Sequence, residues 1–190
     1  MSEAYAHYQN LVAKVAAFGE AICQQYPTQV TCHAGCDGCC YQHFTVFPVE
    51  AYALAQAVAA LSMAERQELQ AQLQQTANPW AVVETPSPCV LLAQGRCRLY
   101  QGRPLICRMH GFPLASSMIE RPDGLQRDCC PLNFSAVPLQ DIASQAVYNL
   151  DLVNQTLVAI NHLFIREHQL PDQRVTMRQA VLTALTMLVA

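Results

Sequence analysis

The chain has 190 residues, of which 52% are hydrophobic and 13% are charged. This composition excludes an intrinsically disordered protein, and the length is sufficient for one domain with a hydrophobic core over residues 1–190. The net charge is −3, so no general attraction to nucleic acid or to an acidic membrane surface is expected.

Ten cysteines raise the question of the redox compartment. The N-terminal segment carries Glu3 and no basic region before an apolar one, so it does not resemble a signal peptide. The most apolar stretch, residues 180–190, is about half of the roughly 20 residues that cross a bilayer. We therefore expect a soluble cytoplasmic protein with no membrane partner. In a reducing compartment, clustered thiols more often bind metal or carry out redox chemistry than form static disulfides.

Helical periodicity dominates the N-terminal part of the chain. A first helix is expected to end before Pro27, and Pro48 suits the first turn of a second helix over residues 49–61. Ser62-Met-Ala-Glu65 forms a capping-box pattern at the start of a third helix, which is expected to end near Asn78-Pro79. The first helix has one apolar face, made of Tyr8, Leu11, Val12, Val15, Phe18 and Ile22.

The central residues 85–138 show no sustained helical or strand period and hold most of the prolines. We expect irregular loops here, with one short helix around Pro104–Met109. An irregular segment of this length is uncommon in a compact domain unless something other than apolar packing orders it, and bound metal would do so.

Two helices are predicted to follow, one with an apolar stripe from Ile142 to about His168 and one after Pro171-Asp172 that runs through VLTALTMLVA. The stripe could be a dimerisation seam or could be buried within the chain, so a monomer or a homodimer is expected. The predicted fold is mainly α, a small helical domain with long irregular cysteine-rich loops at its centre and flanking helices in residues 1–26 and 138–190.

Nine of the cysteines form two blocks, residues 32, 36, 39 and 40 and residues 89, 97, 107, 129 and 130. The spacing Cys36-x-x-Cys39 allows both sulfurs to bind one metal. Adjacent side chains diverge, so Cys39 and Cys40 cannot easily serve the same ion. Either one of them is not a ligand, or the loop serves two metal positions or a multinuclear cluster. Cys23 lies outside both blocks and is expected to be a small buried apolar residue.

The second block can supply the missing ligands, and nine cysteines are enough for two four-ligand sites. Arginines thread this block, and their positive charge would stabilise thiolates. The alternative is a solvated or nucleic-acid-binding basic patch, but a nucleic-acid footprint usually comes with a basic domain. His33, His43 and His110 lie close to cysteines and are secondary ligand candidates. The arginines are Arg96, Arg98, Arg103, Arg108, Arg121 and Arg127.

The ordered motifs Gly35-Cys36-Asp-Gly-Cys39-Cys40, Cys97-x-x-Tyr100-x-x-Arg103-Pro104-x-x-Cys107 and a later Cys129 resemble those of the CxxCxxCC cysteine-cluster family. This is the YkgJ-type zinc- or iron-chelating domain, which a module of flagellin lysine N-methylase also resembles. The resemblance covers about residues 31–130, and three residues rather than two separate Cys32 from Cys36. It implies eight metal ligands, at Cys32, Cys36, Cys39, Cys40, Cys89, Cys97, Cys107 and one of Cys129 or Cys130, with Cys129 preferred.

We therefore expect a metal-binding protein that holds an iron–sulfur cluster, such as 4Fe–4S, or zinc, with iron–sulfur favoured. Its role would be electron transfer, sensing or metal handling, together with an unknown protein or redox partner and no nucleic acid. The alternatives are a cluster-dependent enzyme related to a methylase or an oxidoreductase, and a structural zinc module for protein–protein interaction. No catalytic motif is present, so the sequence favours a metal-binding protein over a stand-alone enzyme.

Overall fold

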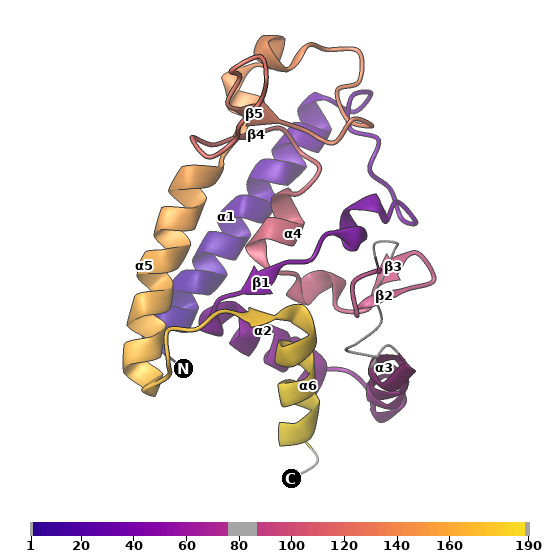
Figure 1. Cartoon of the computed structure of the whole chain (residues 1–190), viewed down its shortest axis with the longest axis vertical. Helices are drawn as coiled ribbons and strands as arrows, with labels where there is room; N and C mark the ends of the chain where they lie inside the picture. The colour runs from indigo at the N-terminus through magenta and orange to yellow at the C-terminus, as the bar shows by residue number, and fades with distance from the viewer. Residues whose placement is uncertain (1, 76–86, 189–190) are drawn as a thin grey trace. The chain divides into compact units, whose positions relative to one another are not determined.

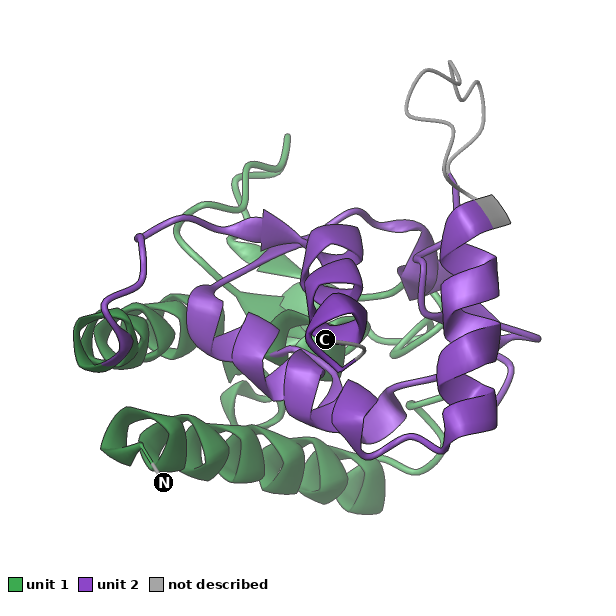
Figure 2. Cartoon of the chain, turned by 90° about the horizontal axis from the view of Figure 1, so that it is seen from below, with its two compact units in different colours: residues 1–33, 105–167 green, residues 34–104, 168–190 purple. Residues whose placement is uncertain are grey.

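The computed structural model describes residues 2–75 and 87–188. Within these residues the protein is mainly α, as the sequence predicts, with six α-helices and a few two-residue strands (Figure 1). The chain divides into two compact units, and each unit is made of two separate stretches of sequence (Figure 2). Unit 1 comprises residues 1–33 and 105–167, and unit 2 comprises residues 34–104 and 168–190.

Unit 1 is built on two long helices, which run in opposite directions. At the start of the first helix, the Ala4 N–H donates to Oε1 of Glu167 near the end of the second, at 3.2 Å. The Tyr148 hydroxyl, just before the second helix, donates to the Val15 carbonyl of the first at 2.7 Å. The helices of this unit are α1 (Glu3–Gln25), α4 (Leu105–Met109) and α5 (Leu150–His168).

A small sheet completes unit 1. Its central strand β4 pairs antiparallel with β5 and parallel with β6. The strands are β4 (Leu114–Ala115), β5 (Arg127–Asp128) and β6 (Tyr148–Asn149).

Local sequence explains the ends of α1. The Ser2 side chain accepts a hydrogen bond from the Tyr5 N–H and so caps the first turn. The helix ends at Gln25, before Pro27, as predicted. Tyr8, Val15 and Ile22 are buried, which confirms that the predicted apolar face points into the unit.

Tyr148 connects α1 to the sheet. Its ring lies 4.6 Å from the Phe18 ring and 5.9 Å from the Phe112 ring, centroid to centroid, in edge-to-face arrangements. A β-carbon at Gly19 would lie 2.8 Å from the Tyr148 hydroxyl oxygen, so α1 can approach this closely because residue 19 is glycine. Burial raises the pKa of Tyr148, which keeps the hydroxyl protonated as a donor.

Unit 2 is a three-helix unit with two short antiparallel strand pairs, of which one is a hairpin. Strand β1 pairs antiparallel with β7, and β2 pairs antiparallel with β3. The helices are α2 (Pro48–Ala59), α3 (Met63–Gln75) and α6 (Met177–Met187). The strands are β1 (Thr45–Val46), β2 (Leu92–Ala93), β3 (Arg96–Cys97) and β7 (Val175–Thr176), and two 3₁₀ turns are η1 (Gly38–Tyr41) and η2 (Tyr100–Gly102).

Reciprocal caps open two of these helices. The Ser62 N–H donates to Glu65 at 2.8 Å and the Glu65 N–H donates back to Ser62, which confirms the predicted capping box of α3. Thr176 and Gln179 form the same arrangement at the start of α6. The expected end of the third helix near Asn78-Pro79 lies outside the described residues.

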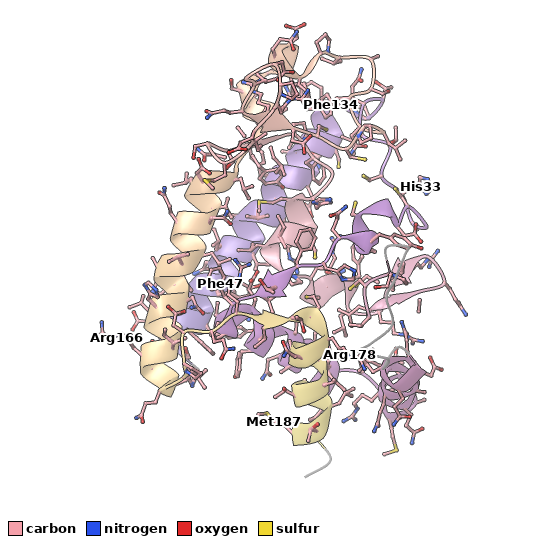
Figure 3. All side chains as sticks on the ribbon, viewed as in Figure 1. His33, Phe47, Phe134, Arg166, Arg178 and Met187 are labelled. Atoms are coloured by element: carbon pink, nitrogen blue, oxygen red, sulfur yellow. The ribbon has the colours of Figure 1, made fainter. Side chains whose placement is uncertain are left out.

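The helices of unit 2 share one hydrophobic core. The guanidinium of Arg178 on α6, labelled in Figure 3, also donates to the Leu73 carbonyl of α3 at 2.7 Å. The core is formed by Val46, Leu54, Val58, Leu69, Leu73, Leu91, Leu99, Met177, Ala180, Val181, Ala184 and Leu185.

The predicted start of the fifth helix is wrong. Ile142 and Ala146 are buried, but they precede the helix, which begins at Leu150. The preceding residues are held in the sheet, because the Tyr148 N–H donates to the Pro113 carbonyl at 2.8 Å. The Asn149 side chain then accepts from the Leu152 N–H at 2.9 Å and caps the helix. Leu157, Ile160 and Phe164 form the buried part of the stripe.

In the part of the chain that the structure describes, no helix combines the length and the apolar character needed to cross a bilayer.

Candidate metal centre

In unit 2, the two cysteine blocks of the sequence meet. Cys39 and Cys40 lie in the 3₁₀ turn η1, Cys89 precedes the β2–β3 hairpin, and Cys97 is the last residue of β3. The Cys89 N–H donates to the Cys40 carbonyl at 2.6 Å, so a backbone hydrogen bond joins the two loops at their cysteines.

The hairpin that carries Cys97 has a specific turn. Leu92 pairs with Cys97 and Ala93 with Arg96, so Gln94 and Gly95 form a two-residue loop. Both residues have positive φ, at 51° and 71°. Such a pair is typical of a type I′ turn, whose twist matches that of the two strands.

Cys89 and Cys97 are anchored on the core of unit 2. Both are half-buried and pack against the apolar cluster shared by the three helices. Each lies two residues before a core leucine, Leu91 and Leu99, which are 1% and 3% exposed. The leucines fix the backbone, and the cysteines are thereby held at the edge of the core.

Four thiols of unit 2 influence one another. The pKa of Cys97 is raised to about 11, mainly by burial, with smaller contributions from the neighbouring Cys89 and Cys40. Burial also raises the pKa of Cys40, followed by the effects of Cys89 and Asp37, and Cys36 acts in the same direction. Thiols with raised pKa values are protonated at neutral pH, so a bound cation would have to displace their protons.

Arg103 is the arginine whose charge acts on these thiols. It lowers the pKa of both Cys40 and Cys97, although less than burial raises it. Its guanidinium lies 3.6 Å from the centroid of the Tyr100 ring, and its Nε–H donates to the Tyr100 carbonyl at 3.0 Å. The cation–π contact fixes the charge beside the thiols.

Three other arginines of the second block bond elsewhere. Arg98 pairs with Glu68 on α3 at 2.9 Å, and Arg121 pairs with Asp123 at 3.0 Å. Arg127 donates to the Ile142 carbonyl at 2.7 Å. Of these four arginines, Arg103 alone acts on the thiols in the predicted direction, whereas the other three stabilise loops and helices.

In unit 1, three further cysteines surround Gly111. The Cys129 thiol donates to the Gly111 carbonyl at 3.4 Å, and the Cys130 N–H donates to the same oxygen at 3.4 Å. A β-carbon at residue 111 would lie 3.7 Å from the Cys32 sulfur and 3.9 Å from the Cys130 β-carbon. Gly111 has φ of +98°, a conformation that glycine adopts readily.

Asn133 holds this arrangement and was missed at the sequence level. It is 2% exposed. Its side-chain amide donates to the Gly111 carbonyl at 2.7 Å and to the Cys32 sulfur at 3.2 Å. Its side-chain oxygen accepts from the Thr31 N–H at 2.8 Å. Asn133 belongs to no motif, and its only signal is an asparagine in a turn-forming segment two residues after a proline.

The Cys129 thiol has a strongly raised pKa. Its pKa is raised to about 12, mainly by burial and then by the neighbouring Cys130, Asp128 and Cys32. Cys32, Cys129 and Cys130 are therefore close enough to affect one another.

The remaining cysteines are Cys107, Cys39 and Cys23. Cys107 is half-buried on the short helix α4, four residues before Gly111. Cys39 neighbours Cys40 in η1, where adjacent side chains diverge by about 120°. Cys23 is exposed, so the expectation that it is buried is wrong. It follows the buried Ile22, and consecutive helical residues point about 100° apart.

The histidine candidates are spread over the chain. His33 is exposed (Figure 3). The His43 Nε2 lies 3.3 Å from the Ser87 hydroxyl oxygen. His110 follows α4 and is half-buried, and burial lowers its pKa. Among residues 2–75 and 87–188, no group of three or more His, Cys, Asp or Glu side chains is already arranged to hold a metal ion.

The sequence model of the CxxCxxCC family, described as "Putative zinc- or iron-chelating domain", matches residues 31–131. The chain belongs to this family. The match contains both thiol sets, from Cys32 to Cys130, which confirms the family resemblance of the motifs and supports metal binding as the function. No curated protein and no solved structure matches the chain significantly.

Proposed function

We propose that this protein binds iron or zinc through cysteine thiolates and that the centre in unit 2 consists of Cys36, Cys40, Cys89 and Cys97. The observation that carries the proposal is the joining of the two cysteine blocks by the Cys89–Cys40 backbone hydrogen bond. Four thiols, contributed by one loop and one hairpin, complete a structural zinc site or hold an iron–sulfur cluster.

The donor set fits these metals. Thiolates are soft ligands, which select zinc and iron–sulfur clusters over magnesium or calcium. Cysteine side chains reorient by rotation about a single bond, so the metal can draw the sulfurs together while the backbone stays in place. Cys89 and Cys97 pack against the core, Cys97 lies in the hairpin, and the Cys40 carbonyl is bonded to the Cys89 N–H.

Of the two metals, we propose iron in an iron–sulfur cluster. Unit 2 holds five cysteines, with Cys39 directly beside Cys40. Cys39 is thus a surplus thiol beside the four proposed ligands, and surplus thiols suit a multinuclear centre better than a single ion. The corresponding role is electron transfer, sensing or metal handling in the cytoplasm, where the free thiols would stay reduced.

The proposal is tested by purifying the protein without oxygen and measuring its iron, zinc and sulfide contents together with its visible spectrum. An iron–sulfur cluster gives a brown protein with broad absorbance that is lost on oxidation. Cys97→Ser is expected to lower the metal content, and Cys23→Ser serves as the matched control because Cys23 is exposed on α1. A colourless protein with stoichiometric zinc would refute the iron assignment.

A protein without either metal, or equal metal contents in the two variants, would refute the ligand assignment as well. Circular dichroism of Cys97→Ser distinguishes loss of a ligand from loss of the fold, because α2, α3 and α6 should remain helical. Cys40→Ser is a second variant that lies outside the core and avoids this ambiguity.

A structural zinc site is the second candidate function, because Cys89 and Cys97 pack directly against the three-helix core. Zinc in this position would stabilise unit 2 outright, since metal-binding free energy adds to folding free energy. Chelation would then lower the unfolding temperature of the zinc-loaded protein and leave its redox behaviour unchanged. A redox-active protein whose unfolding temperature does not respond to chelation would exclude this alternative.

A further inference from the structure

We propose that α5 carries a docking surface for a second copy of this chain and that the two α5 helices pair antiparallel. The inference concerns unit 1 and goes beyond the proposed function, because it does not depend on which metal the thiols bind. The docking surface, which we call the outer stripe, consists of Leu152, Thr156, Ala159 and Leu163.

The outer stripe is distinct from the face by which α5 packs into unit 1. Leu152 and Leu163 are 59% and 47% exposed. Consecutive helical residues point about 100° apart, so the outer stripe lies on another side of the helix from the buried residues. Figure 3 shows Arg166, one turn beyond Leu163, projecting from α5 on the side away from α1. The buried residues of α5 are Leu157, Ile160, Asn161 and Phe164.

Every side chain of the outer stripe can make an apolar contact. A leucine stands at each end of the stripe. The Thr156 hydroxyl donates to the Leu152 carbonyl within the helix at 2.8 Å, so its polar group is satisfied and its methyl group can pack. Ala159 is exposed and small, which allows another helix to approach closely at the middle. The steps of four, three and four residues between the members are those of a coiled-coil seam.

The order of the side chains makes the outer stripe self-complementary. An interface between two copies related by a two-fold axis contacts itself, so residue i of one copy meets residue j of the other and j meets i. With the axis midway between residues 157 and 158 and the helices antiparallel, Leu152 faces Leu163 of the second copy. Thr156 then faces Ala159 of the second copy. Leucines therefore pack at both ends, and the small residues meet in the middle.

Charge favours the antiparallel over the parallel arrangement. Arg166 lies one turn after the outer stripe and Asn149 one turn before it, and both are exposed. In the antiparallel pair, Arg166 faces Asn149 of the second copy and approaches the first turn of that helix, which carries the Asp151 carboxylate. In a parallel pair, the two Arg166 guanidiniums would face each other, and like charges placed together weaken an interface.

A further apolar side chain lies at the same end of α5. The Ser117 N–H donates to the Asp151 carboxylate at 2.9 Å, so Met118, which is 83% exposed, lies beside the first turn of the helix. Stable interfaces bury about 1,200–2,000 Å², and a seam of about three helical turns is at or below the lower end of this range. We therefore expect a weak dimer, with a dissociation constant on the order of 100 μM.

Sedimentation equilibrium of the purified full-length chain tests the proposal. The protein is kept reduced and without oxygen, so that disulfides do not link two chains. The average mass of the wild type should rise with concentration from 21.0 kDa toward twice this value. Leu163→Glu should weaken association by about a hundredfold, because the change occurs twice in a two-fold interface. Leu132→Glu is the matched control, since Leu132 is also 59% exposed in unit 1 but lies outside the outer stripe.

A mixing experiment tests the antiparallel direction. Leu152→Glu and Leu163→Lys should each stay monomeric at concentrations where the wild type associates. Their equimolar mixture should associate, because the introduced carboxylate and ammonium face each other in the antiparallel pair. The remaining Leu163 of the first chain still faces Leu152 of the second. In a parallel pair, the two introduced charges would lie at opposite ends of the stripe and the mixture would gain nothing.

Each outcome bears on the surface and none on metal binding. A wild type that keeps a mass of 21.0 kDa up to about 1 mM would overturn the proposal. Association that persists in Leu163→Glu, or that is lost equally in Leu132→Glu, would also overturn it, because another surface would then be responsible. A mixture that stays monomeric would refute the antiparallel pairing. Circular dichroism verifies that the variants are folded, as expected for substitutions at exposed positions.

Discussion

Replacement of Asn133 by alanine should destabilise unit 1 even when no metal is present. The side chain is 2% exposed and makes hydrogen bonds to three residues in two segments, Thr31 and Cys32 in one and Gly111 in the other. Alanine removes both the donor and the acceptor and leaves the Gly111 carbonyl and the Thr31 N–H to find other partners.

The magnitude follows from these contacts. Each neutral hydrogen bond contributes about 1 kcal/mol net, and a buried group left without a partner costs about 1–3 kcal/mol. The Gly111 carbonyl still accepts from Cys129 and Cys130, so its loss is small, whereas the Thr31 N–H loses its acceptor. We therefore expect a decrease of about 2–4 kcal/mol in the free energy of unfolding of unit 1.

The assay is urea unfolding of the reduced protein in chelator, followed by circular dichroism and by the fluorescence of the tyrosines. Thr31→Val is the matched control, because it removes only the hydroxyl bonds to Leu132 and Asn133 and keeps the backbone N–H. It should cost about 1 kcal/mol or less. An Asn133→Ala protein that is within 0.5 kcal/mol of the wild type, about the size of a typical surface substitution, would refute the reasoning.

Three further changes test the fold. Gly19→Ala should destabilise unit 1 by about 1–3 kcal/mol through overpacking against the Tyr148 hydroxyl, although alanine has the better helix propensity. Thermal unfolding measures this loss of stability, and a stabilised variant would contradict the close approach of α1 to Tyr148. Hydrogen bonds from Ser116 and then from Ser117 lower the pKa of Asp151, so its stabilising effect is present above the ordinary carboxyl range and is lost as pH falls. Asp151→Asn should therefore be less stable than the wild type near pH 7, and the difference should shrink as pH falls below the ordinary carboxyl range. A difference that stays constant as pH falls would disprove the linkage. Leu54 is 0% exposed in the unit 2 core, so Leu54→Ala should lower the free energy of unfolding by about 2–5 kcal/mol, as urea unfolding measures it. A decrease below about 1 kcal/mol would contradict the burial of Leu54 in this core.

Much of the helical structure could be predicted from the sequence, because local signals mark it. Pro27, Pro48 and the Ser62–Glu65 pair act within a few residues of the helix ends that they determine. The start of α5 could not be predicted, because the Tyr148 backbone is held by the distant Pro113 carbonyl. Apolar periodicity does not distinguish a buried loop residue such as Ile142 from a helical one.

The candidate ligands could likewise be named from their spacing, but the sequence does not show which of them belong to the same unit. The assignment of Cys32 to one unit and Cys36 to the other depends on packing between residues far apart in sequence. Asn133 illustrates the same limit, since its partner Thr31 lies about a hundred residues earlier in the chain. Such contacts leave no local pattern of the kind that a helix cap or a CxxC motif leaves.

The interleaving of the two units has a consequence for how the chain folds during synthesis. Residues 34–104 carry all the thiols of unit 2, but α6, which supplies Val181 and Leu185 to its core, is made more than 70 residues later. Unit 1 likewise waits for α5 before α1 has its antiparallel neighbour. During synthesis, the cysteines of residues 34–104 therefore leave the ribosome before the helices that complete their unit have been made. Metal loading should follow translation, and a truncation before Met177 should leave unit 2 thiols exposed to oxidation although every one of them is present.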